Sequence, residues 1–245
     1  MKLIYWLRSF VGMILFISMT ITWATLGIFL NLIFNRRRFD NWIMRSWGKA
    51  TCFFFNIHVK VYGLENFIKG RGAILLFNHA SFIDILAMAA ELNSIRFGAK
   101  IELFKIPIFG YCMRRFGTLP IARNNREEVM KVYEEAKVRF ARGEKFALSP
   151  EGGRFHGDEL SSFKAGPFLF AMTAGVPLIP VVIKGAYETW PKGKILANSD
   201  KAGSVIEIHV LEPVETKNYS VETRGQLQDK IYTQMNAIYK AKTSP

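Results

Sequence analysis

The sequence predicts an α/β fold in which helices flank a mostly parallel twisted sheet, preceded by an N-terminal membrane-associated segment of two helices. A length of 245 residues suits one large α/β domain with an appendage. After residue 56, short apolar runs alternate with helical periodicity, as is typical of parallel sheets. Residues 9–35 contain no charged side chain, as expected of a helix in a membrane.

The N-terminal apolar run at residues 9–34 is long enough to cross a hydrocarbon core of about 30 Å as a helix. A cleaved signal peptide is the alternative, but its apolar region spans only roughly 7–15 residues and ends at a small-residue cleavage site. Here three arginines, residues 36–38, follow the run instead. This heavier positive charge predicts that the chain after the run lies on the cytoplasmic side of the membrane.

Residues 39–56 combine tryptophans with basic side chains. Trp42 and Trp47 suit the headgroup level of a bilayer, so the segment is either an interfacial helix or an ordinary helix packed on the core. A first helix that spans the bilayer and a helical hairpin that lies in one leaflet both remain open. We expect membrane-anchoring helices over 1–56 and an α/β domain over 57–245.

The elements of the α/β part follow from apolar runs and periodicity. The strand at 72–77 is continuously apolar, as expected of a strand covered on both faces. The helix at 126–142 has acids in its first turn and arginines in its last, as the helix dipole favours. Pro120 removes a ladder donor, which predicts an edge strand at 118–122. The other expected strands are 57–63, 95–99, 145–149, 178–185 and 205–214. The other expected helices are 82–92, 163–175 and one capped by Ser220, and residues 106–116 are expected to form a helix or a turn.

The composition favours an anionic partner. Lys and Arg number 33 against 20 Asp and Glu, which gives a net charge of +13. Nucleic acid, anionic lipid and phosphate-bearing substrates all fit this charge. The soluble part has no recognisable nucleic-acid motif, so we expect no nucleic-acid partner. Cys52 and Cys112 stand in apolar runs without metal-ligand spacing, so we expect no metal.

A histidine and an acid stand at one predicted strand–helix junction, "FNHASFID" at residues 77–84. In one reading Ser81 and Asp84 form a helix capping box and His79 is an ordinary loop residue. In the other, Asp84 accepts the Nδ1 proton of His79 and leaves Nε2 as a general base. The sequence has no G-x-S-x-G nucleophile elbow, so the second reading requires the substrate to supply the nucleophile, as an acceptor hydroxyl.

Three polar groups follow the ends of predicted strands. His79 follows the strand at 72–77, Arg123 follows the strand at 118–122, and "PEGGR" at 150–154 follows the strand before it. Ligands of parallel α/β sheets bind at the carboxyl ends of strands. If these strands are parallel neighbours, the three groups converge in one crevice.

Four blocks of the sequence, taken in order, resemble the glycerolipid acyltransferase family. "NHASFID" resembles its N-H-x-x-x-x-D motif, and "GTLPIAR" (117–123) and "PEGGRF" (150–155) resemble its second and third blocks. "VPLIPVVI" (176–183) resembles the fourth. The small size and single N-terminal apolar segment look most like the bacterial 1-acyl-glycerol-3-phosphate acyltransferases of that family.

The resemblance implies acyl transfer from acyl-CoA or acyl carrier protein to the sn-2 hydroxyl of a lysophospholipid, without an acyl-enzyme. It implies no cofactor, contact with the phospholipid bilayer, and a place at the bacterial inner membrane with the catalytic domain on the cytoplasmic side. His79 is the implied base and Asp84 its orienting acid. The implied substrate-binding residues are Asn78, Lys100, Gly117, Arg123, Glu151, Gly152, Arg154 and Lys164, with the arginines holding the acceptor phosphate.

The third block departs from the family pattern at two positions. Gly153 stands where the family usually has Thr, and Phe155 where it usually has Ser. These departures motivate an alternative acceptor, such as a lyso-ornithine lipid or lysophosphatidylglycerol. Two further classes remain open: a hydrolase in which the pair activates water, and a basic membrane-surface module without catalysis.

Overall fold

A seven-stranded sheet with helices on both faces forms the centre of the molecule, and the computed structural model describes residues 2–34 and 37–241. Its strands are β1 (Ile57–Tyr62), β2 (Ala73–Phe77), β3 (Ile95–Lys100), β4 (Leu119–Ile121), β5 (Lys145–Leu148), β6 (Leu178–Lys184) and β7 (Ser204–Val210). Its α-helices are α1 (Lys2–Phe34), α2 (Arg37–Phe54), α3 (Ile83–Glu91), α4 (Phe109–Arg115), α5 (Arg126–Phe140), α6 (Ala165–Ala174), α7 (Ala186–Thr189) and α8 (Arg224–Lys240).

The strand order across the sheet is β1-β7-β6-β2-β5-β3-β4. The β6–β7 pair is antiparallel, and the other paired neighbours run parallel. The predicted α/β class with a mostly parallel sheet is therefore confirmed. Pro120 lies in β4 at one edge of the sheet, as its missing N–H predicted.

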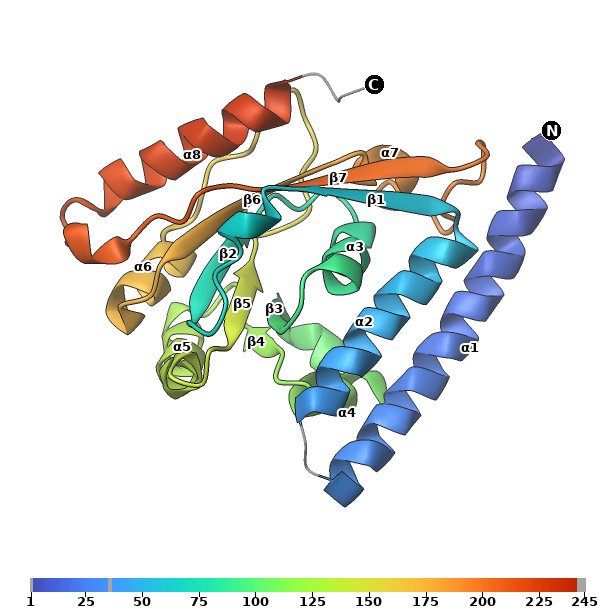
Figure 1. The fold of residues 1–245 in the computed structure, drawn as a ribbon, viewed down its shortest axis with the longest axis horizontal. Helices are drawn as coiled ribbons and strands as arrows, with labels where there is room; N and C mark the ends of the chain where they lie inside the picture. The colour runs from blue at the N-terminus through green and yellow to red at the C-terminus, as the bar shows by residue number, and fades with distance from the viewer. Residues whose placement is uncertain (1, 35–36, 242–245) are drawn as a thin grey trace.

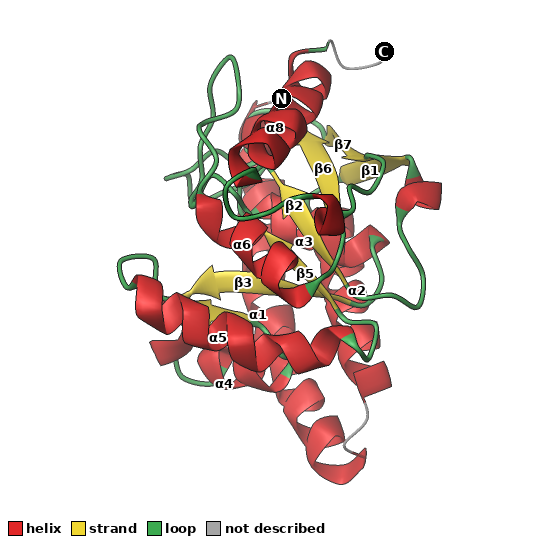
Figure 2. Cartoon of the chain, turned by 90° about the vertical axis from the view of Figure 1, so that its left-hand side faces the viewer, coloured by secondary structure: helices red, strands yellow, loops and turns green. Residues whose placement is uncertain are grey.

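Two hydrophobic layers cover the two faces of the sheet, and β2 contributes alternate side chains to each. Ala73, Leu75 and Phe77 pack in the layer shared with α2 and α3. Ile74 and Leu76 pack in the layer shared with α5, α6 and α8. Figures 1 and 2 show these two sets of helices on opposite sides of the sheet. This alternation is why the continuous apolar run at 72–77 is fully buried.

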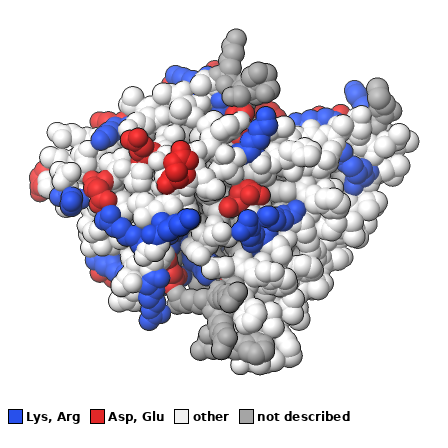
Figure 3. Space-filling view, viewed as in Figure 1, with Lys and Arg blue, Asp and Glu red and all other residues white. Residues whose placement is uncertain are grey.

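The two N-terminal helices pack beside each other and along the α/β part (Figure 1). Helix α1 is long and apolar enough to cross a membrane, by length and composition alone, over Lys2–Leu30. Only 11% of its most hydrophobic window is buried. Figure 3 shows that the side of the molecule formed by α1 carries few charged residues. Met19 of α1 and Trp47 of α2 pack in the same hydrophobic layer as residues of the sheet. The division of the chain into separate parts at 1–56 and 57–245 therefore stays a prediction.

The last helix begins later than predicted. α8 starts at Arg224, with Thr223 at the position before it, and no side chain caps it. Ser220 instead bonds with Thr223 in the preceding turn, where the Ser220 N–H donates to the Thr223 hydroxyl at 2.8 Å. The inward face of α8 is formed by Leu227, Ile231 and Met235, which are fully buried.

Candidate active site

A cavity of about 1260 Å³ opens where the strands β2, β3, β4 and β5 end. Its wall contains His79 from the end of β2, Lys100 from the end of β3, and Arg123 from the loop after β4. Glu151 and Arg154 come from the loop after β5. The strands β2, β5, β3 and β4 are parallel neighbours, so their polar groups meet at one edge of the sheet. The predicted convergence is confirmed.

Asn78 anchors the loop that follows β2. Its side-chain amide donates to the Ile183 carbonyl at 2.8 Å and accepts from the Ile183 N–H at 2.7 Å. The residue is 2% exposed and does not line the cavity. The polar atoms of Asn78 therefore fix the His79 loop to β6, and the substrate-binding role of Asn78 stays a prediction.

His79 and Asp84 form a direct pair. The distance from His79 Nδ1 to Asp84 Oδ2 is 2.8 Å, and the Asp84 side chain is 1% exposed against 15% for His79. An ionised carboxylate only accepts hydrogen bonds, so we assign the proton to Nδ1, which leaves Nε2 unprotonated. Residues five apart on a helix would not meet, but His79 precedes α3 and the loop folds its ring back.

Asp84 also fixes the backbone around the histidine. Its Oδ2 accepts the N–H groups of Ala80 and Ser81, each at 2.8 Å. Ser81 does not form the bond that the expected capping box requires. Its hydroxyl donates to the Trp190 carbonyl at 2.6 Å. It accepts a 3.3 Å bond from the Ile83 N–H rather than from Asp84. The Asp84 carboxylate therefore does both: it accepts backbone N–H groups before α3, and it pairs with His79.

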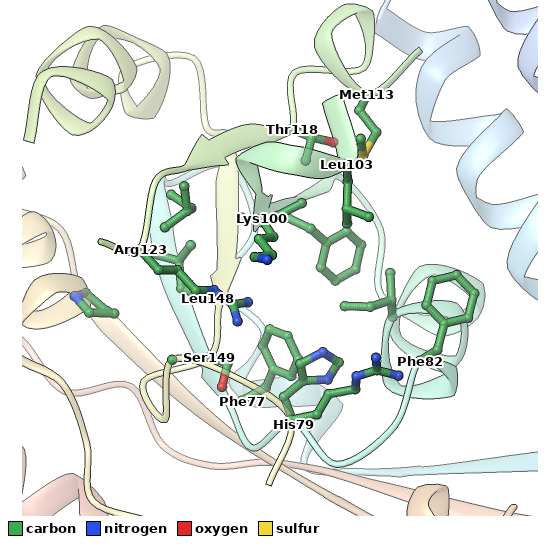
Figure 4. Close-up of a pocket in the computed structure, with 18 of the residues that line it drawn as sticks. Phe77, His79, Phe82, Lys100, Leu103, Met113, Thr118, Arg123, Leu148 and Ser149 are labelled. Carbon is green, nitrogen blue, oxygen red and sulfur yellow. The ribbon is translucent and has the colours of Figure 1, made fainter. Parts of the chain in front are cut away.

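Lys100 and Arg123 point their nitrogens toward the part of the cavity that holds the His79 ring (Figure 4). Burial lowers the pKa of Arg123, the nearby Glu102 carboxylate opposes this, and the neighbouring Arg154 lowers the pKa further. An arginine remains protonated even when its pKa falls somewhat below its ordinary value. The mutual repulsion of Arg123 and Arg154 indicates two positive charges held close together, an arrangement that suits a bound anion.

Glu151 joins the two loops that frame the site. Its Oε1 accepts the His79 N–H at 3.0 Å, and its Oε2 accepts the Ser161 N–H at 3.1 Å. Burial is the largest cause that raises the pKa of Glu151, and these two backbone bonds oppose it. The carboxylate therefore holds the His79 loop in place, in addition to lining the cavity.

We expect Glu151→Gln to lower both stability and activity. A glutamine offers one acceptor where the fold uses two, so one backbone N–H faces an amide donor, at a cost of about 1–3 kcal/mol. Thermal unfolding of the purified variant measures the first effect, and its rate in the acyl-transfer assay that the sequence resemblance implies measures the second. Glu159→Gln is the matched control, because Glu159 is exposed and its carboxylate pairs with Lys240 at the surface. Equal melting temperatures for the two variants would contradict this role.

The same substitution is expected to remove a pH dependence of stability. Because burial raises the folded-state pKa of Glu151, the folded protein binds that proton more tightly than the unfolded chain. Its contribution to stability therefore falls as pH rises from the ordinary glutamate pKa through the raised value. The melting temperature of wild type minus that of Glu151→Gln should decrease over that window. A constant difference would show that the carboxylate is not stabilised in its protonated form.

The two predicted substrate-binding glycines differ in what they meet. Gly152 and Lys164 line the cavity, and Gly152 has φ +76°, a backbone conformation that favours glycine. Gly117 also has φ +76°, but a side chain there would collide with the Arg139 guanidinium, which donates to the Gly117 carbonyl at 2.8 Å. Gly117 does not line the cavity. Gly117 forms the turn before β4, and its substrate-binding role stays a prediction.

Ser149 and Trp190 line the cavity, and the sequence analysis named neither as a site residue. The Ser149 hydroxyl is buried and has no hydrogen-bond partner among the described residues, and Figure 4 shows it beside Phe77 and His79. Its signal was present, because Ser149 is the polar last residue of the predicted strand at 145–149. Trp190 had no comparable signal, since its contact with Ser81 spans 109 positions.

Neither cysteine provides a nucleophile. Burial raises the pKa of the Cys112 thiol to about 11, and burial with the nearby Glu91 carboxylate raises that of Cys52 to about 12. Both thiols are therefore protonated near neutral pH, and thiolate is the reactive form. The fold and the site together define an α/β protein in which a buried His–Asp pair and several cations face one apolar cavity, where a bound hydroxyl can be the nucleophile.

Known proteins share this fold. A protein-family model described as Acyltransferase matches residues 58–184, so the chain belongs to the acyltransferase family. The chain is 31% identical over 196 residues to the putative 1-acyl-sn-glycerol-3-phosphate acyltransferase acl-2 of Caenorhabditis elegans, covering 78% of this chain and 68% of that protein. The crystal structure of the 1-acyl-sn-glycerophosphate (LPA) acyltransferase PlsC from Thermotoga maritima matches with a TM-score of 0.83 at 26% identity, over 100% of both chains.

A plant relative matches over a shorter part of its length. The chloroplastic 1-acyl-sn-glycerol-3-phosphate acyltransferase LPAT1 of Arabidopsis thaliana is 30% identical over 160 residues, which is 64% of this chain and 44% of that protein. The chain spans about half the length of this relative and of two similar chloroplast and algal proteins, at 44%, 46% and 48%. Membership of the family confirms the resemblance that the four sequence blocks indicated.

Proposed function

We propose that the protein transfers an acyl chain from acyl-CoA or acyl carrier protein to the sn-2 hydroxyl of 1-acyl-glycerol-3-phosphate, which makes phosphatidic acid. The observation that carries this proposal is the 2.8 Å His79–Asp84 hydrogen bond at the wall of a cavity that Lys100 and Arg123 also line. The names of the relatives described above support the acceptor class.

The proposed reaction uses a single histidine for both proton transfers. His79 Nε2 takes the proton of the sn-2 hydroxyl as its oxygen attacks the thioester carbonyl carbon. The buried Asp84 carboxylate stabilises the imidazolium that forms. The tetrahedral intermediate then expels the thiolate, which takes the proton from Nε2, and the new ester leaves with the acceptor. No acyl-enzyme forms, and the step uses no cofactor beyond the acyl donor.

The arginines are expected to select for acceptors that carry phosphate. Loss of a charge-assisted hydrogen bond of about 1.5–3 kcal/mol predicts a drop in kcat/KM of roughly 10- to 100-fold for Arg123→Ala or Arg154→Ala with lysophosphatidic acid. A neutral monoacylglycerol lacks the phosphate, so it serves as the internal control and should lose much less. Steady-state kinetics with the two acceptors measure the difference. An equal loss on both acceptors would remove the phosphate assignment.

The decisive experiment for the proposed function is a competition assay. Purified protein receives a mixture of lysolipids and a mixture of acyl thioesters, and mass spectrometry identifies the products beside those of His79→Ala. The proposal expects phosphatidic acid as the main product and its loss in the variant. Thioester hydrolysis at the same rate with every lysolipid removed would show a hydrolase instead.

A different lysolipid acceptor is the second candidate, because the third block departs from the family pattern. At Gly153, the position of an added Cβ lies 3.4 Å from the Arg123 guanidinium, so a threonine there would contact this arginine. Phe155 is 44% exposed and adds apolar surface beside the site. In the same competition assay, acylated ornithine lipid or phosphatidylglycerol as the main product would favour this candidate.

The proposed acceptor lies in a membrane, and α1 supplies the surface that faces it. Arg8 and Ser9 bond to the Asn198 carbonyl at one end of α1, and Gly27 packs against Phe116 nearer the other end. A spanning α1 would draw the attached α/β part into the bilayer with it. We therefore favour α1 and α2 lying in one leaflet, with the catalytic domain on the cytoplasmic side of the bacterial inner membrane.

A further inference from the structure

The cavity that holds His79 carries more positive charge than one phosphate group requires. Glu151 is the one Asp or Glu among the described lining residues, and its oxygens accept two backbone N–H groups. Seven Lys and Arg side chains line the same cavity: Lys100, Arg123, Arg126, Arg154, Lys164, Lys194 and Arg224. A lysophosphatidic acid brings a single phosphate, so the remaining cations indicate a second anionic group in the cavity.

Three of these cations come from the side of the cavity built by α5, α6 and α8. Arg126 is the first residue of α5, Lys164 directly precedes α6, and Arg224 is the first residue of α8. Their helices are held together here. The Gln228 amide of α8 donates to the Phe163 carbonyl at 2.9 Å, directly before Lys164.

Helices α5 and α6 pack tightly beside this group of cations. The rings of Tyr133 and Phe170 stack at 4.0 Å, which joins the two helices. One turn from Arg126, Val129 and Met130 line the cavity, as do Pro167 and Leu169 at the beginning of α6. An apolar wall next to a group of cations suits an amphipathic chain that ends in a phosphate.

No acid among the residues that the structure describes forms a salt bridge with Arg126, Lys164 or Arg224. The Nε of Arg224 is buried and has no hydrogen-bond partner among them. Neither α6 nor α8 has an acid in its first turn. A buried donor without a partner costs stability, which a bound anion would restore.

We propose that Arg126, Lys164 and Arg224 form a subsite for the phosphate of the acyl donor's phosphopantetheine arm. This inference rests on the proposed function, in which both substrates carry phosphate and the cations near His79 take that of the acceptor. Coenzyme A and acyl carrier protein share the arm and its 4′-phosphate. The apolar wall of α5 and α6 accommodates the arm, and the thioester at its end reaches His79.

The test compares three palmitoyl thioesters at saturating lysophosphatidic acid. They are palmitoyl-CoA, palmitoyl-acyl carrier protein, and S-palmitoyl-N-acetylcysteamine, which has no phosphate. Arg224→Gln and Arg126→Gln are each expected to raise the KM for a phosphate-bearing donor roughly tenfold, the effect of losing one charge-assisted contact. The KM for lysophosphatidic acid and the kcat/KM for the phosphate-free thioester are expected to change less than about twofold.

Arg142→Gln is the matched control, because Arg142 is exposed, follows α5 and does not line the cavity. It removes the same charge and should leave every KM unchanged. In Arg224→Gln and Arg126→Gln, a higher KM for palmitoyl-CoA alone identifies coenzyme A as the donor. A higher KM for the protein-bound thioester alone identifies acyl carrier protein as the donor. The subsite is overturned if the KM rises for neither phosphate-bearing donor. It is also overturned if the kcat/KM for the phosphate-free thioester falls as much as that for the phosphate-bearing donors. The phosphate-free thioester also reports whether each variant is folded.

Calorimetric titration with free coenzyme A and with holo-acyl carrier protein separates this inference from the proposed function, since binding needs no turnover. If no lysolipid is acylated but Arg224→Gln weakens binding roughly tenfold, the proposed function fails and the subsite stands. If lysophosphatidic acid is acylated but Arg224→Gln binds both donors like wild type, the subsite fails and the proposed function stands.

Discussion

His79→Ala is expected to lower the rate of acyl transfer by roughly 10²–10⁴, the usual size of a general-base contribution. The imidazole is held by Asp84 at 2.8 Å and is the one histidine among the cavity-lining residues that the structure describes. Its loss leaves the acceptor hydroxyl with no base in that position. The measurement is kcat with lysophosphatidic acid and palmitoyl-CoA in mixed micelles.

His156→Ala is the matched control for that prediction. His156 follows the third sequence block, its ring stacks on Tyr187 at 3.6 Å, and it does not line the cavity. It should keep most of the wild-type rate. A purified His79→Ala protein with full activity would remove the proposed base. The hydrolase alternative uses the same base, so the assay also follows thioester consumption without acceptor.

The sequence contained enough local information to predict which residues come together at the strand ends. A continuous apolar strand followed by His79, and a second followed by the 150–154 block, place both at one edge if the strands are parallel. The structure pairs β2 with β5 in parallel, so the prediction holds. The spacing of five positions between His79 and Asp84 left the paired and unpaired readings both open, and the resemblance favoured the pair.

Two predicted substrate-binding residues, Asn78 and Gly117, have structural partners that are distant in sequence. Asn78 has its partner 105 positions away in β6, and Gly117 has its partner 22 positions away in α5. A conserved-looking motif suggests function for each of its members, but these two are used to fix backbone. Pattern reasoning could not separate them from Arg123, because all three stand beside strand ends.

The N-terminal helix α1 contacts the loop that carries His79, which the predicted division of the chain at residue 56 did not indicate. The ring centroid of Phe16 in α1 lies 6.1 Å from that of Phe82, directly beside the His79 loop. It lies 6.0 Å from the ring centroid of Trp190. Trp190 in turn accepts the Ser81 hydroxyl bond. Periodicity does not distinguish an aromatic residue that faces a membrane from one that packs in a core. Only the packing in the structure shows that α1 contacts the His79 loop.

Asp84 allows the structural and catalytic contributions of one side chain to be measured apart. Its Oδ2 accepts three hydrogen bonds at 2.8 Å, from His79 Nδ1 and from the N–H groups of Ala80 and Ser81. Asp84→Asn keeps an oxygen for the backbone but removes the negative charge that stabilises the imidazolium. We expect its melting temperature to stay near wild type, while kcat falls by roughly 10²–10⁴.

Asp84→Ala is expected to lose stability as well as activity. It leaves two buried backbone N–H groups without an acceptor, at a cost of about 1–3 kcal/mol for each. Thermal unfolding of the two variants beside the exposed control Asp158→Asn separates the effects, because only Asp84→Ala should melt clearly below wild type. A wild-type rate in Asp84→Asn would mean that the pair fixes the loop and that the carboxylate charge takes no part in the chemistry.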